Sequence, residues 1–288
     1  MTAMTAPSGV LVPTLSNEDF VSLQRLLLDH AAIQLDQQRS YLVDARLRPV
    51  ARRYHLSGVS ELIRALRPDS PQMVTDIVDA LTSNDTAFML HSELVDSLVE
   101  QVLPELLAAR DPSQPLTIWS AACSSGQEPY SLAILLHERY PKLVAAGQVR
   151  IVASDLSPTM VMRCAAGRYS RIEVNRGLPP EILARQFERD SRDWLVRPEL
   201  RSTVEVRVIN LIHAWPGVPR CDLVLARNVL PFFPEPVRNQ VVDRIRRTAL
   251  KSYGYLVVGP DEPALGPQSG FEPLGLSHHA CYRMTERI

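Results

Sequence analysis

The spacing of hydrophobic residues changes about a third of the way along the chain. After Ser16, apolar residues such as Phe20 and Leu23 recur every three or four positions, a period that predicts helices. Ser16 with Asp19 resembles a capping pattern for the first of them. The later helices of this region are expected over 39–54, 59–66 and 72–81. Pro49 is expected to kink or interrupt the second helix of the region.

From residue 116 onward, short apolar runs alternate with amphipathic segments. The expected strands span 116–121, 149–154, 204–209, 223–226 and 255–259, with two further short strands within 271–283. The expected helices span 128–140, 158–166, 180–187 and 237–249. Strands that alternate with helices predict an α/β domain with a mainly parallel, Rossmann-like sheet covered on both faces. We therefore expect a flexible leader over 1–15, a helical domain over 16–95 and the α/β domain over 96–288.

Composition and charge narrow the classes of partner and compartment. The net charge of −1 in 288 residues indicates no overall attraction to nucleic acid or to membranes. No apolar run approaches the roughly 20 residues of a membrane span, and the N-terminus lacks a secretory signal pattern. The four cysteines form no C-x-x-C pair, which argues against a zinc site and a disulfide scaffold. We expect a cytoplasmic monomer without a bound metal.

The stretch Ile118–Ser131 (IWSAACSSGQEPYS) is the most informative part of the chain. A strand runs into small residues, which let a ligand approach the backbone, and then into Glu128 at the start of a helix. A carboxylate at that point suits a cationic ligand and repels phosphate. A nicotinamide dinucleotide would require the pattern G-x-G-x-x-G, whereas this loop contains the single Gly126. A dinucleotide oxidoreductase is therefore disfavoured.

Polar residues follow the carboxyl ends of several expected strands, where open parallel sheets bind ligands. Asp155 ends the second strand, Asn210 the third, and Arg227 with Asn228 the fourth. An acidic residue at the position of Asp155 can accept hydrogen bonds from ribose hydroxyls, although it can also cap the helix that follows. The two roles can coexist. Together with Glu128, these positions favour S-adenosylmethionine, a sulfonium cation without phosphate.

Several segments taken together resemble successive motifs of CheR-type methyltransferases. They occur in the family's order and are WSAACSSGQEPYSLAILL, ASDLSPTMVMRCAAGRYS, VINL, CDLVLARNVLPFF, GPDE and, nearer the N-terminus, LTSNDTAF. The resemblance covers roughly residues 16–284. It implies a helical N-terminal domain that is followed in the chain by a Rossmann-like methyltransferase sheet. It also implies methylation of glutamate side chains on chemotaxis receptors, with S-adenosylmethionine as donor and S-adenosylhomocysteine as product.

The resemblance also assigns positions in the donor site. The family's donor-binding residues correspond to Asn84, Thr86, Glu128, Asp155, Asn210, Leu211, Arg227 and Asn228. By this resemblance Glu128 holds the methionine amino group and Asp155 the ribose. Asn210 and Leu211 then frame the adenine.

Two positions depart from the family pattern. Where the family has phenylalanine followed by arginine, this chain has Met89 and Leu90, and where it has tyrosine, this chain has Phe232. The lost arginine positions donor and substrate, and His91 beside it is a weak substitute at best. No catalytic residue is therefore assigned. The alternative is a weakened or inactive scaffold protein of a chemosensory pathway that binds S-adenosylmethionine or S-adenosylhomocysteine.

Partner recognition is expected in two further regions. Seven arginines against three acidic residues lie between Asp36 and Arg67. Such a basic face suits the acidic helices of a chemoreceptor's cytoplasmic region, although solvated surface is the alternative interpretation. The receptor-binding candidates are Arg46, Arg48, Arg52 and Arg53. The family's antiparallel hairpin insertion corresponds to 189–203, which is short, so we expect a reduced hairpin that does not rely on a tethering receptor peptide.

Overall fold

The computed structural model describes residues 15–36, 40–67, 69–90, 92–275 and 280–285. The leader expected over 1–15 thus lies almost entirely outside the described residues. His91, the proposed substitute for the family's arginine, also lies outside them. Contacts divide the chain into two units after Thr82, ahead of the boundary expected at residue 95. The division falls earlier because the next segment packs on the second unit. The Phe88 ring meets the ring of Tyr169 edge-on, with a centroid distance of 4.9 Å.

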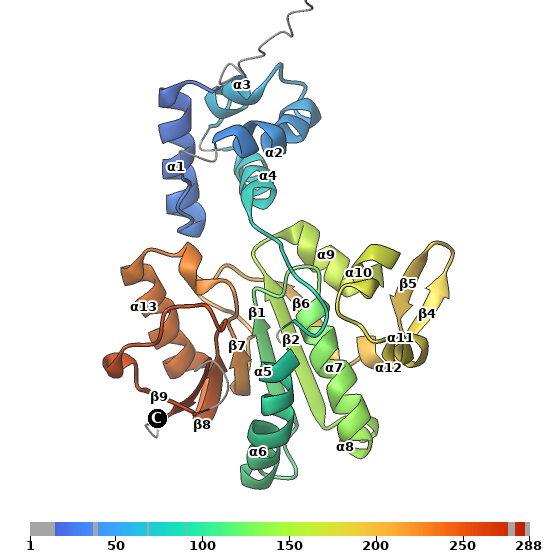
Figure 1. Ribbon diagram of the computed structural model, residues 1–288. Helices are drawn as coiled ribbons and strands as arrows, with labels where there is room; N and C mark the ends of the chain where they lie inside the picture. Colours follow the sequence, from blue (N-terminus) through green and yellow to red (C-terminus); the bar gives the residue numbers. More distant parts are fainter. Residues whose placement is uncertain (1–14, 37–39, 68, 91, 276–279, 286–288) are drawn as a thin grey trace, which may run out of the picture. The chain divides into compact units, whose positions relative to one another are not determined.

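The first unit is helical, as predicted. It contains α1 (Asn17–Ala31), α2 (Ser40–Arg53), α3 (Val59–Arg64) and α4 (Pro71–Leu81) (Figure 1). The Ser16 hydroxyl accepts a hydrogen bond from the Asp19 amide and so caps α1. Asp19 itself pairs with Arg64 of α3, so its carboxylate joins two helices of this unit.

Helix α2 continues through Pro49, and the expected interruption there is wrong. Val43, Leu47, Val50 and Ala51 are all buried and lie at helical spacing on one face. Pro49 is exposed on the other side of the helix. Proline removes one backbone hydrogen bond, and the packing of this apolar face stabilises the helix in spite of that loss.

The second unit begins with helical turns and then forms the central sheet. The leading turns are α5 (Ser92–Ser97), the π-helical η2 (Leu98–Val102) and α6 (Leu103–Ala109). Within the described residues the main sheet has seven strands in the order β6-β2-β1-β7-β8-β10-β9. Their bounds are β1 (Leu116–Ala121), β2 (Val149–Asp155), β6 (Val204–Val208), β7 (Cys221–Leu225), β8 (Leu250–Val257), β9 (Phe271–Pro273) and β10 (Cys281–Met284).

The strand pairing confirms the mainly parallel sheet. β6, β2, β1, β7 and β8 pair in parallel, whereas β10 and β9 pair antiparallel. Ala121 of β1 lies beside Ser154 of β2, and Asp155 beside Val208 of β6. The carboxyl ends of these strands therefore meet at one edge, where the sequence placed its polar residues.

Helices of the second unit connect and cover these strands. They are α7 (Gln127–Arg139), α8 (Pro141–Ala145), α9 (Pro158–Ala166), α10 (Arg171–Asn175), α11 (Pro180–Gln186), α12 (Pro198–Arg201) and α13 (Glu235–Arg244), with the turns η3 (Leu230–Phe232), η4 (Ile245–Ala249) and η5 (Pro267–Ser269). Helices α7 and α9 pack on β2 and β6, and η4 packs on β7 and β8. Among the described residues, no helix combines the length and apolar character needed to cross a membrane.

A small antiparallel sheet lies at the periphery of this unit, in the order β3-β5-β4 (Figure 1). It consists of β3 (Arg168–Tyr169), β4 (Phe187–Asp190) and β5 (Asp193–Val196). The hairpin itself thus covers 187–196, not 189–203. The expected range was wrong at its end because Pro198 starts the helical turn α12. The third strand, β3, was not predicted, since two residues are too short to show a pattern.

Candidate active site

The loop after β1 adopts a tight conformation that few residues tolerate. Ala122 and Ser124 have φ values of 67° and 51°, and Gly126 has φ of 100°. A Cβ atom at position 126 would lie 2.7 Å from the Cys164 sulfur. Because non-glycine residues in the left-handed region carry a conformational cost, their clustering here indicates a loop shaped for a ligand rather than for stability.

Asp155 braces this loop from the end of β2. Its Oδ2 atom accepts a hydrogen bond from the Ser124 amide at 2.8 Å, and its Oδ1 atom accepts one from the Ser157 amide at 2.9 Å. The helix cap of α9 is Ser157, whose hydroxyl accepts from the Met160 amide. Asp155 is therefore not the N-cap itself. Each carboxylate oxygen retains acceptor capacity for a ligand hydroxyl.

Glu128 and Arg227 form an ion pair at the same edge, 3.1 Å between Oε2 and Nη1. Their side chains are 16% and 4% exposed, respectively. The other Glu128 oxygen accepts from the Ser120 hydroxyl at 2.7 Å, and Arg227 Nη2 donates to the Leu90 carbonyl at 2.9 Å. The sequence analysis assigned both residues to the expected donor site but did not predict their pairing. Such pairing holds the carboxylate of Glu128 in one orientation.

The residues after β7 meet the loop after β8. Asn228 has a φ value of 58°, a conformation that asparagine tolerates better than most residues. Glu262 Oε1 accepts a hydrogen bond from the Val229 amide at 3.0 Å. Gly259 permits this approach, because a Cβ there would lie 2.6 Å from Asn228 Oδ1 and 3.1 Å from Glu262 Cγ.

Glu262 is the carboxyl of this edge whose pKa moves towards neutrality. Burial raises the pKa of Glu262 to about 7, while hydrogen bonds from the amides of Gly259, Val229 and Asn228 and the charge of Arg227 oppose that rise. Glu262 Oε2 and Arg227 Nε are both buried and have no hydrogen-bond partner in the described structure.

Asn210 and Leu211 follow β6 and are joined to the same edge through the backbone. The amide of Ile209 donates to the Asp155 carbonyl at 2.9 Å, which places Asn210 next to the end of β2. Asn210 Oδ1 accepts from the Ile212 amide at 3.2 Å. Leu211 is buried, and its carbonyl accepts from Arg244 Nη1 at 3.3 Å. This loop is thus fixed from several sides.

The segment before α5 contributes the remaining predicted positions. The Asn84 carbonyl accepts from the Ser124 hydroxyl at 3.2 Å, while Thr86 is half-buried. Met89 has a φ value of 49°, and its amide donates to Ser131 Oγ at 2.9 Å. The half-buried Leu90 is tied in by its carbonyl rather than by its side chain. Phe232 in η3 is 38% exposed.

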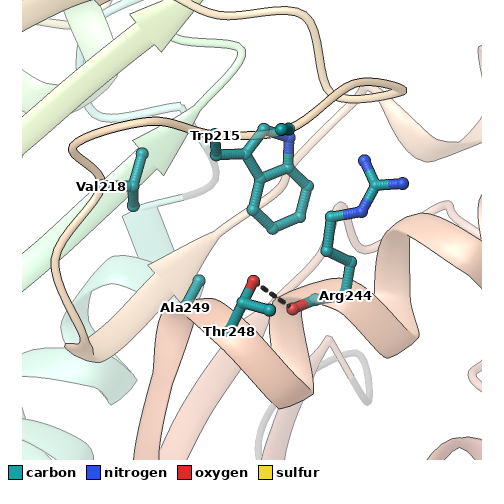
Figure 2. Close-up of a pocket in the computed structure, with 6 residues that line it drawn as sticks. Trp215, Val218, Arg244, Thr248 and Ala249 are labelled. Atoms are coloured by element: carbon teal, nitrogen blue, oxygen red, sulfur yellow. Dashed lines mark hydrogen bonds between the residues drawn. The ribbon is translucent and has the colours of Figure 1, made fainter.

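A separate cavity of about 360 Å³ lies beside the loop after β6. Figure 2 shows Trp215 and Val218 from that loop facing Arg244, Thr248 and Ala249. The Arg244 guanidinium lies over the Trp215 ring, 5.3 Å from its centroid. None of the predicted donor-binding residues lines this cavity. Its arginine instead supports the Leu211 backbone, so we regard the cavity as part of the loop's scaffold and not as the active site.

Three contributors escaped the sequence analysis. Ser120 lies inside a quoted motif, and its role depends on the side chain of Glu128 reaching it. Glu262 lies in the quoted GPDE loop without an assigned role, and its place after β8 at the carboxyl edge was the available signal. Arg244 is distant in sequence from Leu211, and no pattern indicated their contact.

These residues fit S-adenosylmethionine in their chemistry. Glu128 and Asp155 supply carboxylates for an ammonium group and for ribose hydroxyls, and small residues of the first loop leave the backbone accessible. A phosphate-bearing ligand fits poorly beside Glu128 and Asp155.

The four candidate arginines of the first unit all lie on α2 and are exposed. Arg46 donates to the carbonyls of Leu81 and Thr82 at the end of α4. Arg48 pairs with Asp44, and Arg53 pairs with Asp76 at 2.9 Å. The side chain of Arg52 has no partner within the described residues. Acidic residues of the same unit therefore neutralise part of the positive charge of this face.

Comparison with known proteins gives matches over both units. The family model described as the CheR methyltransferase SAM-binding domain matches residues 84–279, and the CheR methyltransferase all-alpha domain matches residues 18–82. The chain is 37% identical to chemotaxis protein methyltransferase 1 of Pseudomonas aeruginosa, over 93% of this chain and 98% of that protein. It is 33% identical to chemotaxis protein methyltransferase Cher2 of Pseudomonas putida over the same shares.

Proposed function

The chain belongs to the CheR methyltransferase family, and we propose that it transfers methyl groups from S-adenosylmethionine to glutamate side chains of chemotaxis receptors. The family resemblance predicted from the ordered motifs is confirmed by both family models. One structural observation carries the proposal furthest: the Glu128–Arg227 pair lies at the carboxyl edge of the sheet that Asp155 also borders. The relatives named above are chemotaxis protein methyltransferases, which supports the receptor as substrate.

We assign the donor-binding roles from the chemistry of this edge. Glu128 binds the amino group of the methionine part, and Asp155 accepts hydrogen bonds from the ribose hydroxyls. Asn210 and Leu211 frame the adenine, on a loop that Arg244 holds in place. Arg227 and Asn228 keep Glu128 and the turn after β7 oriented, while Asn84 and Thr86 border the pocket from the preceding segment.

The reaction needs little proton chemistry from the protein. S-adenosylmethionine supplies a methyl group carried on a sulfonium. A glutamate side chain is ionised at neutral pH, with a reference pKa of about 4.3, so no general base is required to activate it. The chain's own residues then contribute by aligning the two partners and excluding water. Activity consequently depends on the geometry of the edge more than on any single catalytic group.

The departures at Leu90 and Phe232 affect alignment rather than donor binding. The backbone of residue 90 still accepts a hydrogen bond from Arg227, so the segment keeps its place without an arginine side chain. Phe232 lacks the hydroxyl of the family's tyrosine. We infer that turnover is slower than in family members that retain both residues, while the donor pocket is intact.

We also propose α2 as the receptor-binding helix. Within the described residues Arg52 has no ion-pair partner, so it can form a new pair without breaking one of these, whereas Arg48 and Arg53 are already paired with Asp44 and Asp76. Arg46 caps α4 and has a structural role besides. A receptor's methylation helices lie on the cytoplasmic side, so we place this enzyme, as a monomer, in the cytoplasm. Deletion of a receptor's C-terminal peptide should leave binding unchanged.

Incorporation of methyl label tests the proposal. The enzyme is incubated with methyl-labelled S-adenosylmethionine and with cytoplasmic fragments of chemoreceptors from the same organism. We expect label that is released as methanol by base, because carboxyl methyl esters hydrolyse readily, and none with receptor glutamates changed to alanine. Binding of S-adenosylhomocysteine without any incorporation would contradict the enzymatic proposal and favour a scaffold protein.

A further inference from the structure

Glu262 is a half-buried residue at the carboxyl edge of the sheet, with its Oε2 atom buried, and the reaction provides no role for it. It lies in the loop after β8, and β8 pairs in parallel with β7, so this loop neighbours the turn that carries Arg227 and Asn228. Its Oε1 atom accepts from the Val229 amide at 3.0 Å, in the turn that also carries Arg227 and Asn228. One side chain of the loop after β8 is thus bonded to the backbone of the turn after β7.

The contacts of Gly259 indicate that this arrangement is specific. A Cβ atom at position 259 would lie 2.6 Å from Asn228 Oδ1 and within 3.2 Å of the Glu262 carboxyl carbon. Asn228 itself has a left-handed backbone, with φ of 58°. Without the Glu262 carboxyl, the turn after β7 would lose the acceptor of its Val229 amide.

Charge connects Glu262 to the donor site. Arg227 pairs with Glu128 on one side, and its charge acts on Glu262 on the other. Arg227, two residues after β7, acts on this carboxyl through its charge and is paired with Glu128 of α7, whereas the neighbouring Asp261 is exposed. Glu128, Arg227 and Glu262 together offer two possible anions for one cation. A ligand ammonium beside Glu128 would add a second cation and balance these charges.

We propose that Glu262 is a positioning residue of the donor pocket, whose carboxylate orients the Arg227–Asn228 turn and supplies the negative charge that balances Arg227 when a donor ammonium binds Glu128. This inference rests on the donor-binding role proposed for Glu128. In the free protein the Glu262 carboxyl, with a pKa of about 7, is partly protonated near neutral pH. The bound ammonium adds a positive charge beside Glu128, and this added charge favours the ionised form of Glu262. The proton passes to the buffer.

Proton release on ligand binding is a direct test. S-adenosylhomocysteine, which carries the same amino acid group, is titrated into the full chain by calorimetry at pH 7 in buffers of different ionisation enthalpy. We expect the wild type to release up to about half a proton per ligand, because burial raises the pKa of Glu262 to about 7 and the carboxyl is half protonated there. Glu262→Gln should release close to none. The matched control Asp261→Asn removes an exposed carboxyl next to it and should behave as wild type.

The pH dependence of affinity supplies a second measurement. Between pH 6 and 8 the wild-type affinity should rise by up to about tenfold, because ionised Glu262 favours the bound state, whereas Glu262→Gln should stay flat. At pH 6 the two should bind within about threefold, since glutamine keeps an acceptor for the Val229 amide and resembles the protonated acid. Glu262→Ala, which removes that acceptor, should bind about tenfold more weakly at pH 6.

The outcomes separate this inference from the proposed function. Wild-type proton release in Glu262→Gln, or none in the wild type, overturns the role of Glu262 and leaves Glu128 untouched. Unchanged binding by Glu128→Gln instead overturns the proposed site. Glu262→Gln is isosteric, so its result stands even if Glu262→Ala fails to fold, and thermal unfolding of each variant shows which have folded.

Discussion

The carboxyl edge of the sheet and helix α2 hold their charges in opposite ways. At the edge, Arg227 is 4% exposed and bonds to both Glu128 and the Leu90 carbonyl, so the charge is held in one position. On α2, the Arg53 side chain is 65% exposed although it pairs with Asp76, and Arg52 has no partner in the described residues. Buried pairs are costly to break, whereas exposed pairs contribute about 0–1 kcal/mol each. The edge should therefore be sensitive to single substitutions and the helix should not.

The largest effect is expected from Arg227→Ala. This change leaves Glu128 partly buried without its cation, which should cost about 3–5 kcal/mol of unfolding free energy and abolish detectable donor binding. Denaturant unfolding and calorimetry with S-adenosylhomocysteine measure the two effects. Arg227→Lys, which keeps the charge and loses the second hydrogen bond, serves as the control and should lie in between. If Arg227→Ala is as stable as the wild type and still binds S-adenosylhomocysteine, the sheet edge is no more sensitive to single substitutions than helix α2.

Restoring the family residues should have the next largest effect, and it should appear in turnover. Leu90→Arg with Phe232→Tyr is expected to raise kcat by about 100-fold or more if alignment limits the reaction. The magnitude follows that of hydrogen-bond donors that stabilise transition states in other enzymes. Affinity for S-adenosylhomocysteine should change little, because residue 90 already contributes through its carbonyl. Methyl incorporation under saturating donor measures the gain. An unchanged rate would mean that other residues compensate for the losses.

Asp155→Asn should weaken S-adenosylhomocysteine binding by about 10–100-fold, which corresponds to roughly 1.5–3 kcal/mol for hydrogen bonds to a charged group. The amide side chain keeps an oxygen for one of the two loop amides but loses the charged acceptor for ribose hydroxyls. Titration calorimetry gives the value, and the circular dichroism spectrum should stay unchanged. Loss of less than threefold would restrict Asp155 to its bracing of the loop.

The smallest effects are expected on α2. Arg52→Glu should reduce receptor affinity by a few fold at low salt and by less at physiological ionic strength, because screening weakens exposed charges. Arg48→Glu, matched in chemistry and helix but already paired with Asp44, should reduce it less. Surface plasmon resonance at two salt concentrations distinguishes the two. Equal losses, or none in either variant, would remove α2 from the receptor interface.

The fold was accessible from the sequence where local patterns were long. The strand over Leu116–Ala121 and the helix over Pro158–Ala166 were predicted with the observed bounds, because apolar runs, a proline and a glycine mark their ends. The two-residue strand β3 and the continuous α2 across Pro49 were not, since both depend on tertiary packing. A helix-breaking residue such as proline is tolerated when buried apolar residues before and after it pack the helix against its neighbours.

The site was accessible as a set of positions but not as a network. Strand ends predicted Asp155 and Arg227, and the loop after the first strand predicted Glu128, because parallel strands bring their carboxyl ends together. Their hydrogen bonds were out of reach, since the Arg227 contacts join residues 99 and 137 positions apart in the chain. Glu262 was quoted in a motif without a role for the same reason: its partners lie on the neighbouring loop.

The central claim is that the carboxylate of Glu128 binds the donor's ammonium group at this edge, and calorimetry on one substitution tests it most directly. S-adenosylhomocysteine is titrated into the wild type and into Glu128→Gln, which preserves shape and removes the charge. We predict binding to the wild type and a loss of at least about 100-fold in Glu128→Gln, with the folded state preserved. Equal affinity of the two proteins for S-adenosylhomocysteine would contradict the account.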